Sequence, residues 1–280
     1  MTPLELADLL DPSHYIQQQI SLPPQPSILV QIRLLTEQSD TNLHTIAELI
    51  ARDVSLTAGL FRVTNSAARG LSSPLSSVDQ AISVLGLKQV LNLVKALSLR
   101  KAVGGTAPFY LHFWERSDDL AVLATLVARR YVSMQVSFEL AYMAGLFMDC
   151  GVPLLIERFP TYCEAFQLSD GMSWPNLQAE DRQFHTDHRV VGYLVARHWH
   201  LPDLVCDAIR DRGTHCQRDQ DHAPLVACLQ FARHVYHQSK HLPDYEWPEF
   251  ANAALTTLDI PIGLEQEHID DLAENFRLSI

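Results

Sequence analysis

Apolar residues recur at helical spacing along most of this chain, and the alternation typical of strands is almost absent. The strongest pattern is residues 141–156, AYMAGLFMDCGVPLLI, which is apolar on nearly every side. A helix that is apolar all round belongs in a protein interior. We therefore predict two buried helical segments, joined at Asp149, Cys150 and Gly151, as the central helix pair of the protein.

Capping and turn residues divide the rest of the pattern into further helices. Asp53 can cap one helix, Ser77-x-x-Gln80 has the form of a capping box, and Gly86 tolerates the left-handed geometry of a helix end. The predicted helices cover residues 3–10, 14–20, a stretch from 27, 43–50, 53–65, 77–86, 87–103, 113–132, 138–148, 152–159, 177–184, 187–199, 202–212, 224–238 and two within 250–279. The predicted fold class is therefore all-α.

The clearest break in this pattern is residues 104–108, GGTAP. Glycine and proline are the strongest interruptions of regular structure, so we place a domain boundary there. The prediction is an N-terminal helical bundle at residues 1–103 and a second helical bundle at residues 104–280.

Charge and cysteine content narrow the class of protein. The formal net charge is −12, which argues against broad binding of nucleic acid, because that needs clustered Lys and Arg. The five cysteines include no CxxC pair, which favours a reducing compartment. The N-terminus lacks the basic region of a signal peptide, and we expect no apolar run long enough to cross a bilayer. We expect a cytoplasmic protein without a membrane partner.

Asp149 is the candidate with the most chemical content. It is the only carboxylate between Leu140 and Leu155, in otherwise apolar surroundings. A buried carboxylate must be paired, hydrogen-bonded or bound to a metal. The partner of Asp149 therefore bears on most of the functional question.

Two sets of motifs lie along residues 22 to about 237. The first set is LPPQPSIL at 22–29, IARD at 50–53, VTNSA at 63–67 and PLSSVDQAISVLGLKQVLNL at 74–93. The second set is FWERS at 113–117, AGLFMDCG at 144–151, FHTDHRVVG at 184–192, HWHLPDLVCDAIRDRGTH at 198–215 and LVACLQFARHV at 225–235. Both sets resemble the HDOD family, with one departure at Val54, where the family usually has proline.

This resemblance implies an N-terminal HDOD helical bundle packed against a degenerate HD-like helical bundle. HDOD proteins are mostly bacterial signalling or regulatory proteins, often beside response-regulator, diguanylate-cyclase or phosphodiesterase modules. Enzymatic activity is generally not expected of them. True HD enzymes are metal-dependent phosphohydrolases with His, His-Asp and Asp ligands.

Most of these ligand positions carry other residues here. Arg116 stands at the first histidine, Met148 at the histidine of His-Asp, and Arg233 at the last aspartate, while Asp149 is retained. The paired histidines expected near 212 and 213 are replaced, the first by Arg212. A guanidinium has no lone pair to give and a thioether is too soft for Mg²⁺ or Mn²⁺. The resemblance therefore implies no metal cofactor.

We predict instead that Arg116, alone or together with Arg233, forms a salt bridge with buried Asp149, since a planar guanidinium suits that pairing. The alternative is that both arginines reach solvent and that Asp149 only caps the helix after Cys150. The predicted residual pocket comprises Arg116, Met148, Asp149, His188, Arg212 and Arg233. If a metal were bound after all, Asp149, His188 and His185 would be its candidate ligands.

Asn65, Ser66, Ser76 and Ser77 form the second candidate site. These residues can hydrogen-bond exposed backbone groups at helix ends, which is a structural role. The alternative is a surface that binds a partner.

The expected function is a non-catalytic signal-transduction module that binds a regulatory protein or a small ligand, with no catalytic residue and no cofactor assigned. Two alternatives stay open. One is a divergent metal-dependent phosphohydrolase. The other is a sensor of a nucleotide second messenger, because arginines left in such a pocket suit a phosphate-containing ligand.

Overall fold

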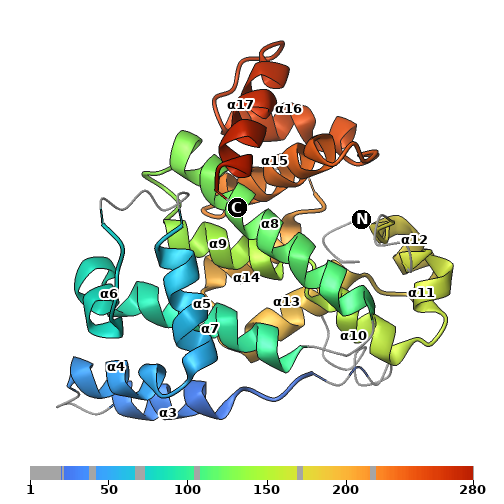
Figure 1. Cartoon of the computed structure of the whole chain (residues 1–280). Coiled ribbons are helices and arrows are strands. Elements are labelled where there is room, and N and C mark those ends of the chain that lie inside the picture. The colour runs from blue at the N-terminus through green and yellow to red at the C-terminus, as the bar shows by residue number, and fades with distance from the viewer. Residues whose placement is uncertain are drawn as a thin grey trace.

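The computed structural model describes residues 20, 22–37, 42–66, 73–103, 108–168, 173–214 and 219–279, and the regular elements among them are α-helices (Figure 1). This confirms the all-α prediction. The two helices expected within residues 3–20 lie outside the described residues, except for Ile20, which is not helical.

The N-terminal helices begin and end where the capping residues predict. Asp53 accepts a hydrogen bond from the Leu56 amide (3.0 Å), Ser77 accepts one from the Gln80 amide (3.1 Å), and Gly86 has φ 89° at the end of its helix. Each cap satisfies a backbone group that a helix end leaves open. The helices are α3 (Ser27–Thr36), α4 (Leu43–Ala51), α5 (Val54–Thr64), α6 (Val78–Leu85) and α7 (Leu87–Ala102).

The second bundle follows after residues 104–107. Its helices are α8 (Pro108–Tyr131), α9 (Phe138–Phe147), α10 (Gly151–Arg158), α11 (Tyr162–Ala165), α12 (Leu177–Phe184), α13 (His188–His198), α14 (Asp203–Asp211), α15 (Ala223–Ser239), α16 (Trp247–Thr257) and α17 (Glu265–Arg277). The helix predicted from residue 113 begins earlier, because Pro108 can occupy a first helical turn. In Figure 1, α16 and α17 cap the end of the molecule where α15 lies.

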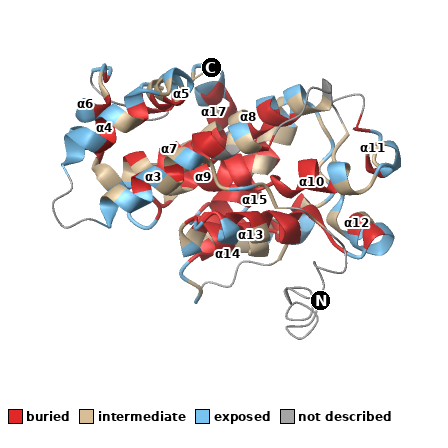
Figure 2. Ribbon diagram, turned by 90° about the horizontal axis from the view of Figure 1, so that it is seen from below, coloured by how far each residue is buried: buried red, intermediate tan, exposed pale blue. Residues whose placement is uncertain are grey.

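The predicted central pair is the core of the second bundle. Residues 141–150 are all buried, and α9 packs against α7, α8, α14 and α15 (Figure 2). The segment Phe138–Arg158 is long and apolar enough to cross a membrane, so the expectation that no run has that length is wrong. Burial explains the composition, since 89% of its apolar window is inside the protein.

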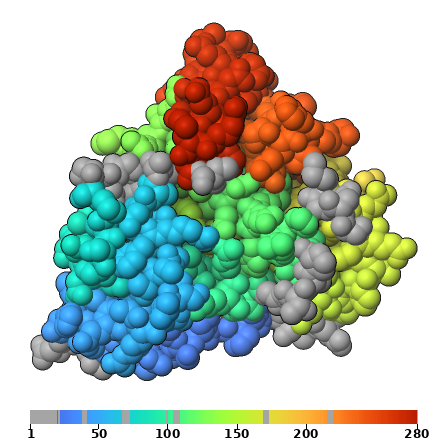
Figure 3. All heavy atoms as spheres, viewed as in Figure 1, coloured from blue at the N-terminus to red at the C-terminus, as the bar shows by residue number. Residues whose placement is uncertain are grey.

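The two bundles pack together along α7 and α9, and Figure 3 shows the N-terminal helices against α8 in the space-filling view. Arg100 of α7 donates to both carboxylate oxygens of Asp118 in α8, at 2.8 and 2.5 Å. The indole of Trp199 donates to the Pro23 carbonyl (2.9 Å). The division at residues 103 and 104 stays a prediction.

Candidate functional site

Asp149 lies in the turn between α9 and α10 and is only 2% exposed. Arg212, just after α14, donates from Nη2 to Asp149 Oδ1 at 2.7 Å and from Nε to the Met148 carbonyl at 3.0 Å. On the other side, Arg116 Nε lies 3.5 Å from Asp149 Oδ2. Two guanidinium groups therefore flank one buried carboxylate.

The predicted ion pair between Arg116 and Asp149 is present, but the shorter contact comes from Arg212. Asp149 does not act as a side-chain cap, because its Oδ1 accepts from Arg212 and its Oδ2 accepts no hydrogen bond from the described residues. Of the two options for this salt bridge, the one in which Arg233 also pairs with Asp149 is wrong. Arg233 instead pairs with Asp244 (3.2 Å) and with Glu246, which follow α15 in a turn close to Arg233.

A close helix contact brings His188 to the same cluster. A Cβ atom on Gly151 would lie 2.0 Å from the His188 carbonyl oxygen, so only glycine permits this approach of α10 to α13. His188 Nε2 then lies 3.4 Å from Asp149 Oδ1, and its Nδ1 lies 2.5 Å from Glu180 Oε2. The Tyr162 hydroxyl donates to the other oxygen of Glu180.

The opposite charges in this cluster control its protonation. Burial raises the pKa of Asp149, but Arg212, His188 and Arg116 outweigh burial and hold the pKa well below its usual range. Burial lowers the pKa of His188, but Glu180 and Asp149 outweigh it and raise the pKa to about 9. Asp149 is therefore ionised and His188 protonated near neutral pH.

Arg116 connects this buried cluster to an open cavity. Its guanidinium carbon lies 4.3 Å from the centroid of the Trp174 ring and 4.8 Å from that of Tyr236. Although Arg116 is only 6% exposed, it also lines a cavity of about 380 Å³ together with Trp174, Arg233 and Tyr245. Arginine stacked between aromatic rings is held in one orientation by cation–π attraction.

Comparison with known proteins identifies this architecture. The family model described as HDOD domain matches residues 22–214, which is more than half of the chain. The chain belongs to the HDOD family. The match crosses the break at residues 104–107, so the family unit includes residues on both sides of it.

Several solved structures share this fold. A structure from Marinobacter aquaeolei VT8 named "Putative signal transduction protein" aligns with TM-score 0.67 and 21% identity over 98% of this chain and 63% of that one. A structure from Shewanella amazonensis SB2B named "Putative phosphohydrolase" aligns with TM-score 0.66 and 19% identity over 98% and 97%. At these identities the likeness shows the fold alone.

A curated protein of Treponema pallidum (strain Nichols), named "Uncharacterized protein", is 23% identical over 212 residues. The alignment covers 75% of this chain and 41% of that protein, so the chain spans about two fifths of the length of this relative.

The residues of this HDOD protein do not fit the divalent metal ion of HD enzymes. Arg212 Nη2 donates to Asp149 Oδ1 (2.7 Å) and lies 2.6 Å from His188 Nε2, so a guanidinium fills the space in which a metal ion bridging these two side chains would lie. His185 is exposed at the end of α12, in contrast to Asp149 and His188, which are buried. Among the described residues, no group of three or more His, Cys, Asp or Glu is placed to hold a metal.

The second candidate site makes local hydrogen bonds. Asn65 donates to the Leu75 carbonyl (2.9 Å) and accepts from the Leu75 amide (2.7 Å), while Ser66 donates to the Val63 carbonyl. Ser77 caps α6, and the Ser76 hydroxyl bonds the Gln80 side chain (3.0 Å). These contacts support the structural role, and partner binding here stays a prediction.

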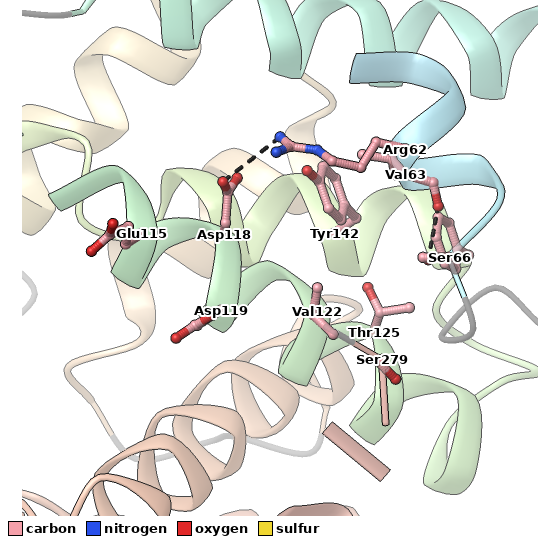
Figure 4. Close-up of a pocket in the computed structure, with 11 residues that line it drawn as sticks. Arg62, Val63, Ser66, Glu115, Asp118, Asp119, Val122, Thr125, Tyr142 and Ser279 are labelled. Carbon is pink, nitrogen blue, oxygen red and sulfur yellow. Dashed lines mark hydrogen bonds and ion pairs between the residues drawn. The ribbon is translucent and has the colours of Figure 1, made fainter. Parts of the chain in front are cut away.

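Ser66 also lines a cavity of about 330 Å³ between α5, α8 and α9 (Figure 4). Three carboxylates line this cavity, but Asp118 pairs with Arg100 and Arg62, and Asp119 pairs with Lys240 (3.2 Å). Because their charges are already compensated, these aspartates do not make a cation site.

Sequence reasoning missed Glu180, Tyr162 and Trp174. Glu180 lies in a helix rich in polar residues, where a buried carboxylate has no distinct pattern. Only its burial and its contact with His188 identify it. Trp174 precedes Pro175, and a residue before proline in a loop indicates a turn. Nothing in that pattern indicates that its ring stacks on Arg116.

Proposed function

We propose that this HDOD protein is a non-catalytic regulatory module of signal transduction, which acts in the cytoplasm by binding a protein or small-ligand partner. The observation that carries this proposal is the position of Arg212, which contacts Asp149 and His188 at 2.7 and 2.6 Å. The guanidinium supplies the positive charge that a metal ion supplies in an HD enzyme.

The chemistry of phosphate hydrolysis supports this proposal. A catalytic metal needs deprotonated ligands with free lone pairs and an open position for water. Here Asp149 is paired on both sides, and the pKa of His188 is raised to about 9. Near neutral pH the protonated imidazole of His188 has no lone pair to give, which leaves Asp149 as a single carboxylate between two guanidinium groups.

The main alternative is a divergent metal-dependent phosphohydrolase, and two measurements separate it from the proposal. Protein purified without chelator or metal affinity resin is analysed for Fe, Mn, Mg and Zn, and hydrolysis of bis-p-nitrophenyl phosphate is followed with added Mn²⁺. We expect far less than stoichiometric metal and no hydrolysis above that of the Asp149→Asn variant. Stoichiometric metal, with hydrolysis that Asp149→Asn abolishes and Asp203→Asn retains, would overturn the proposal.

A nucleotide second messenger is the second candidate partner. Arg116 and Arg233 both line the 380 Å³ cavity, and the Trp174 ring forms part of its wall. Arginine binds phosphate and an aromatic ring can stack on a base. A ligand of the native state raises stability, so millimolar nucleotides should raise the melting temperature of the wild type and not that of Trp174→Leu. No shift with any nucleotide argues against this candidate.

A further inference from the structure

A groove of about 770 Å³ lies where the N-terminal helices meet the second bundle. It is lined by α3, by the first half of α7 and by the loop before α14. Leu29, Ile32, Leu87 and Leu91 give it an apolar lining. An apolar groove of this volume is large enough to take several side chains of a ligand.

Asn92 lines this groove and carries an unused hydrogen-bonding group. It is only 8% exposed, and its carboxamide makes no hydrogen bond with any residue that the structure describes. The nitrogen and oxygen of this carboxamide are not among the buried unpaired atoms of the described residues, so they remain accessible from the groove. A donor and an acceptor side by side therefore face the groove without a partner.

The groove is also positively charged, in a protein whose net charge is −12. Lys88 has no ion-pair partner in the described part of the chain, and Arg33 reaches only Glu37, at 4.0 Å. Lys95 donates to the His200 carbonyl (3.0 Å), which leaves its charge uncompensated. The one acidic lining residue, Asp203, already pairs with Arg197 outside the groove.

We infer that this groove binds an extended, acidic peptide segment of a partner protein, whose backbone the Asn92 carboxamide clamps. The chain already uses an asparagine in this way, since Asn65 bonds both the amide and the carbonyl of Leu75 at 2.7 and 2.9 Å. Apolar side chains of the peptide fill the groove between Leu29 and Leu91. Its acidic residues face Arg33 and Lys88.

This inference goes beyond the proposed function and uses no residue of the Asp149 cluster. Changes in the groove leave metal content and phosphodiester hydrolysis untouched, so the two proposals fail in different experiments.

In the test, short random peptides displayed on phage are selected for binding to the 280-residue chain, and the most enriched sequence is synthesised as a fluorescein-labelled probe. We expect enriched peptides to combine Asp or Glu with apolar residues. In fluorescence anisotropy, Lys88→Glu and Asn92→Leu should each weaken binding of this probe about tenfold. Added salt should weaken binding as well. Arg277→Glu, at an exposed site on α17, is the matched charge control and should bind as the wild type does.

Unfolding measurements separate this role from a structural one. The Asn92 carboxamide has no hydrogen-bond partner among the described residues to lose. Asn92→Leu should therefore keep or raise the urea midpoint of unfolding while it weakens binding of the probe peptide. A lowered midpoint would indicate that the amide serves the fold and would overturn the inference.

Two further outcomes would also overturn it. One is a selection without enrichment, or a probe that neither groove variant affects. The other is tighter probe binding by a variant of the 280-residue chain that carries Glu5→Gln, Asp8→Asn and Asp11→Asn together. That result would show that the acidic N-terminal segment of this chain, and not a partner, occupies the groove.

Discussion

At the scale of single residues, the site is organised by the charge of Asp149. Its carboxylate is buried, and its two guanidinium partners come from α8 and from the end of α14. Removing one member of a buried ion pair leaves an uncompensated charge, which costs far more than losing a surface pair. The ion pairs that take the place of a metal ion at Asp149 are therefore also ion pairs on which the stability of the fold depends.

Arg212→Gln should lower the free energy of unfolding by about 3–5 kcal/mol, because Asp149 loses its closest counter-charge. Asp149→Asn should do the same, and the double variant should cost about 1–3 kcal/mol less than the sum of the two. Urea unfolding measures all three. Arg197→Gln is the control, since its pair with Asp203 is largely exposed and contributes only about 0–1 kcal/mol. Additive costs would show that Arg212 and Asp149 do not interact.

The raised pKa of His188 predicts a pH dependence of stability. The folded state binds the proton more tightly than the unfolded chain, with a pKa of about 9 against an ordinary value of 6.5. The contribution is fully present below pH 6.5 and is lost as the pH rises through 9. The difference is on the order of 3 kcal/mol.

Urea unfolding between pH 6 and pH 10 checks this prediction. The wild type should lose stability over the window from 6.5 to 9, and His188→Gln should give a flatter profile. His198→Gln, an exposed change on the same helix, should follow the wild type. A His188→Gln profile parallel to that of the wild type would contradict the assignment.

At the scale of elements, the site depends on the crossing of α10 and α13. Gly151 is the first residue of α10 and packs against the His188 carbonyl of α13. Gly192 lies on the side of α13 that faces Gly151. Both glycines belong to the motifs that resemble the HDOD family. The contact distances differ, however, and so should the effects of adding a methyl group.

Gly151→Ala should destabilise the protein by about 1–3 kcal/mol or more, because its Cβ would meet the His188 oxygen at 2.0 Å. Gly192→Ala should be tolerated within about 1 kcal/mol, since its Cβ has no neighbour nearer than Cys150 Sγ at 3.4 Å and alanine favours a helix. Thermal unfolding compares the two variants. Equal losses would mean that α10 can shift away from α13.

At the scale of the whole molecule, the two bundles share their core. α7 packs against α9, and the Arg100–Asp118 pair and the Trp199–Pro23 hydrogen bond join the two parts at separate points. A surface buried between bundles couples their unfolding, because neither can open without exposing it. We therefore expect one cooperative transition.

The four tryptophans all lie in the second bundle, so their fluorescence reports mainly on that part, and among the described residues Trp199 alone donates a hydrogen bond to the N-terminal part, at Pro23. Leu60→Ala, in the core of α5, should cost about 2–5 kcal/mol and shift the fluorescence and far-UV circular dichroism transitions together. Leu229→Ala, in α15, is the matched change in the second bundle. A fluorescence transition that Leu60→Ala leaves in place would show that residues 1–103 unfold separately.

How far the site could be predicted differs from residue to residue. The Arg116–Asp149 pair was predictable because Asp149 stands alone in an apolar segment and the family motifs place Arg116 opposite it. Arg212 was assigned to the pocket but not to Asp149, since the two residues are 63 positions apart and no local pattern sets their distance. Arg233 was misassigned, because Asp244 and Glu246 return beside it through a turn whose path depends on packing.

The helices, their caps, the buried central pair and the HDOD family can all be read from the amino-acid order, because helix formation and capping depend on neighbours within a few residues. The packing of the helices sets which arginines neutralise Asp149, adds Glu180 and Tyr162 to the cluster, and leaves Asn92 facing a groove without a partner. These are contacts between residues far apart in the chain. Their distances follow from how the helices pack, which local sequence patterns do not specify.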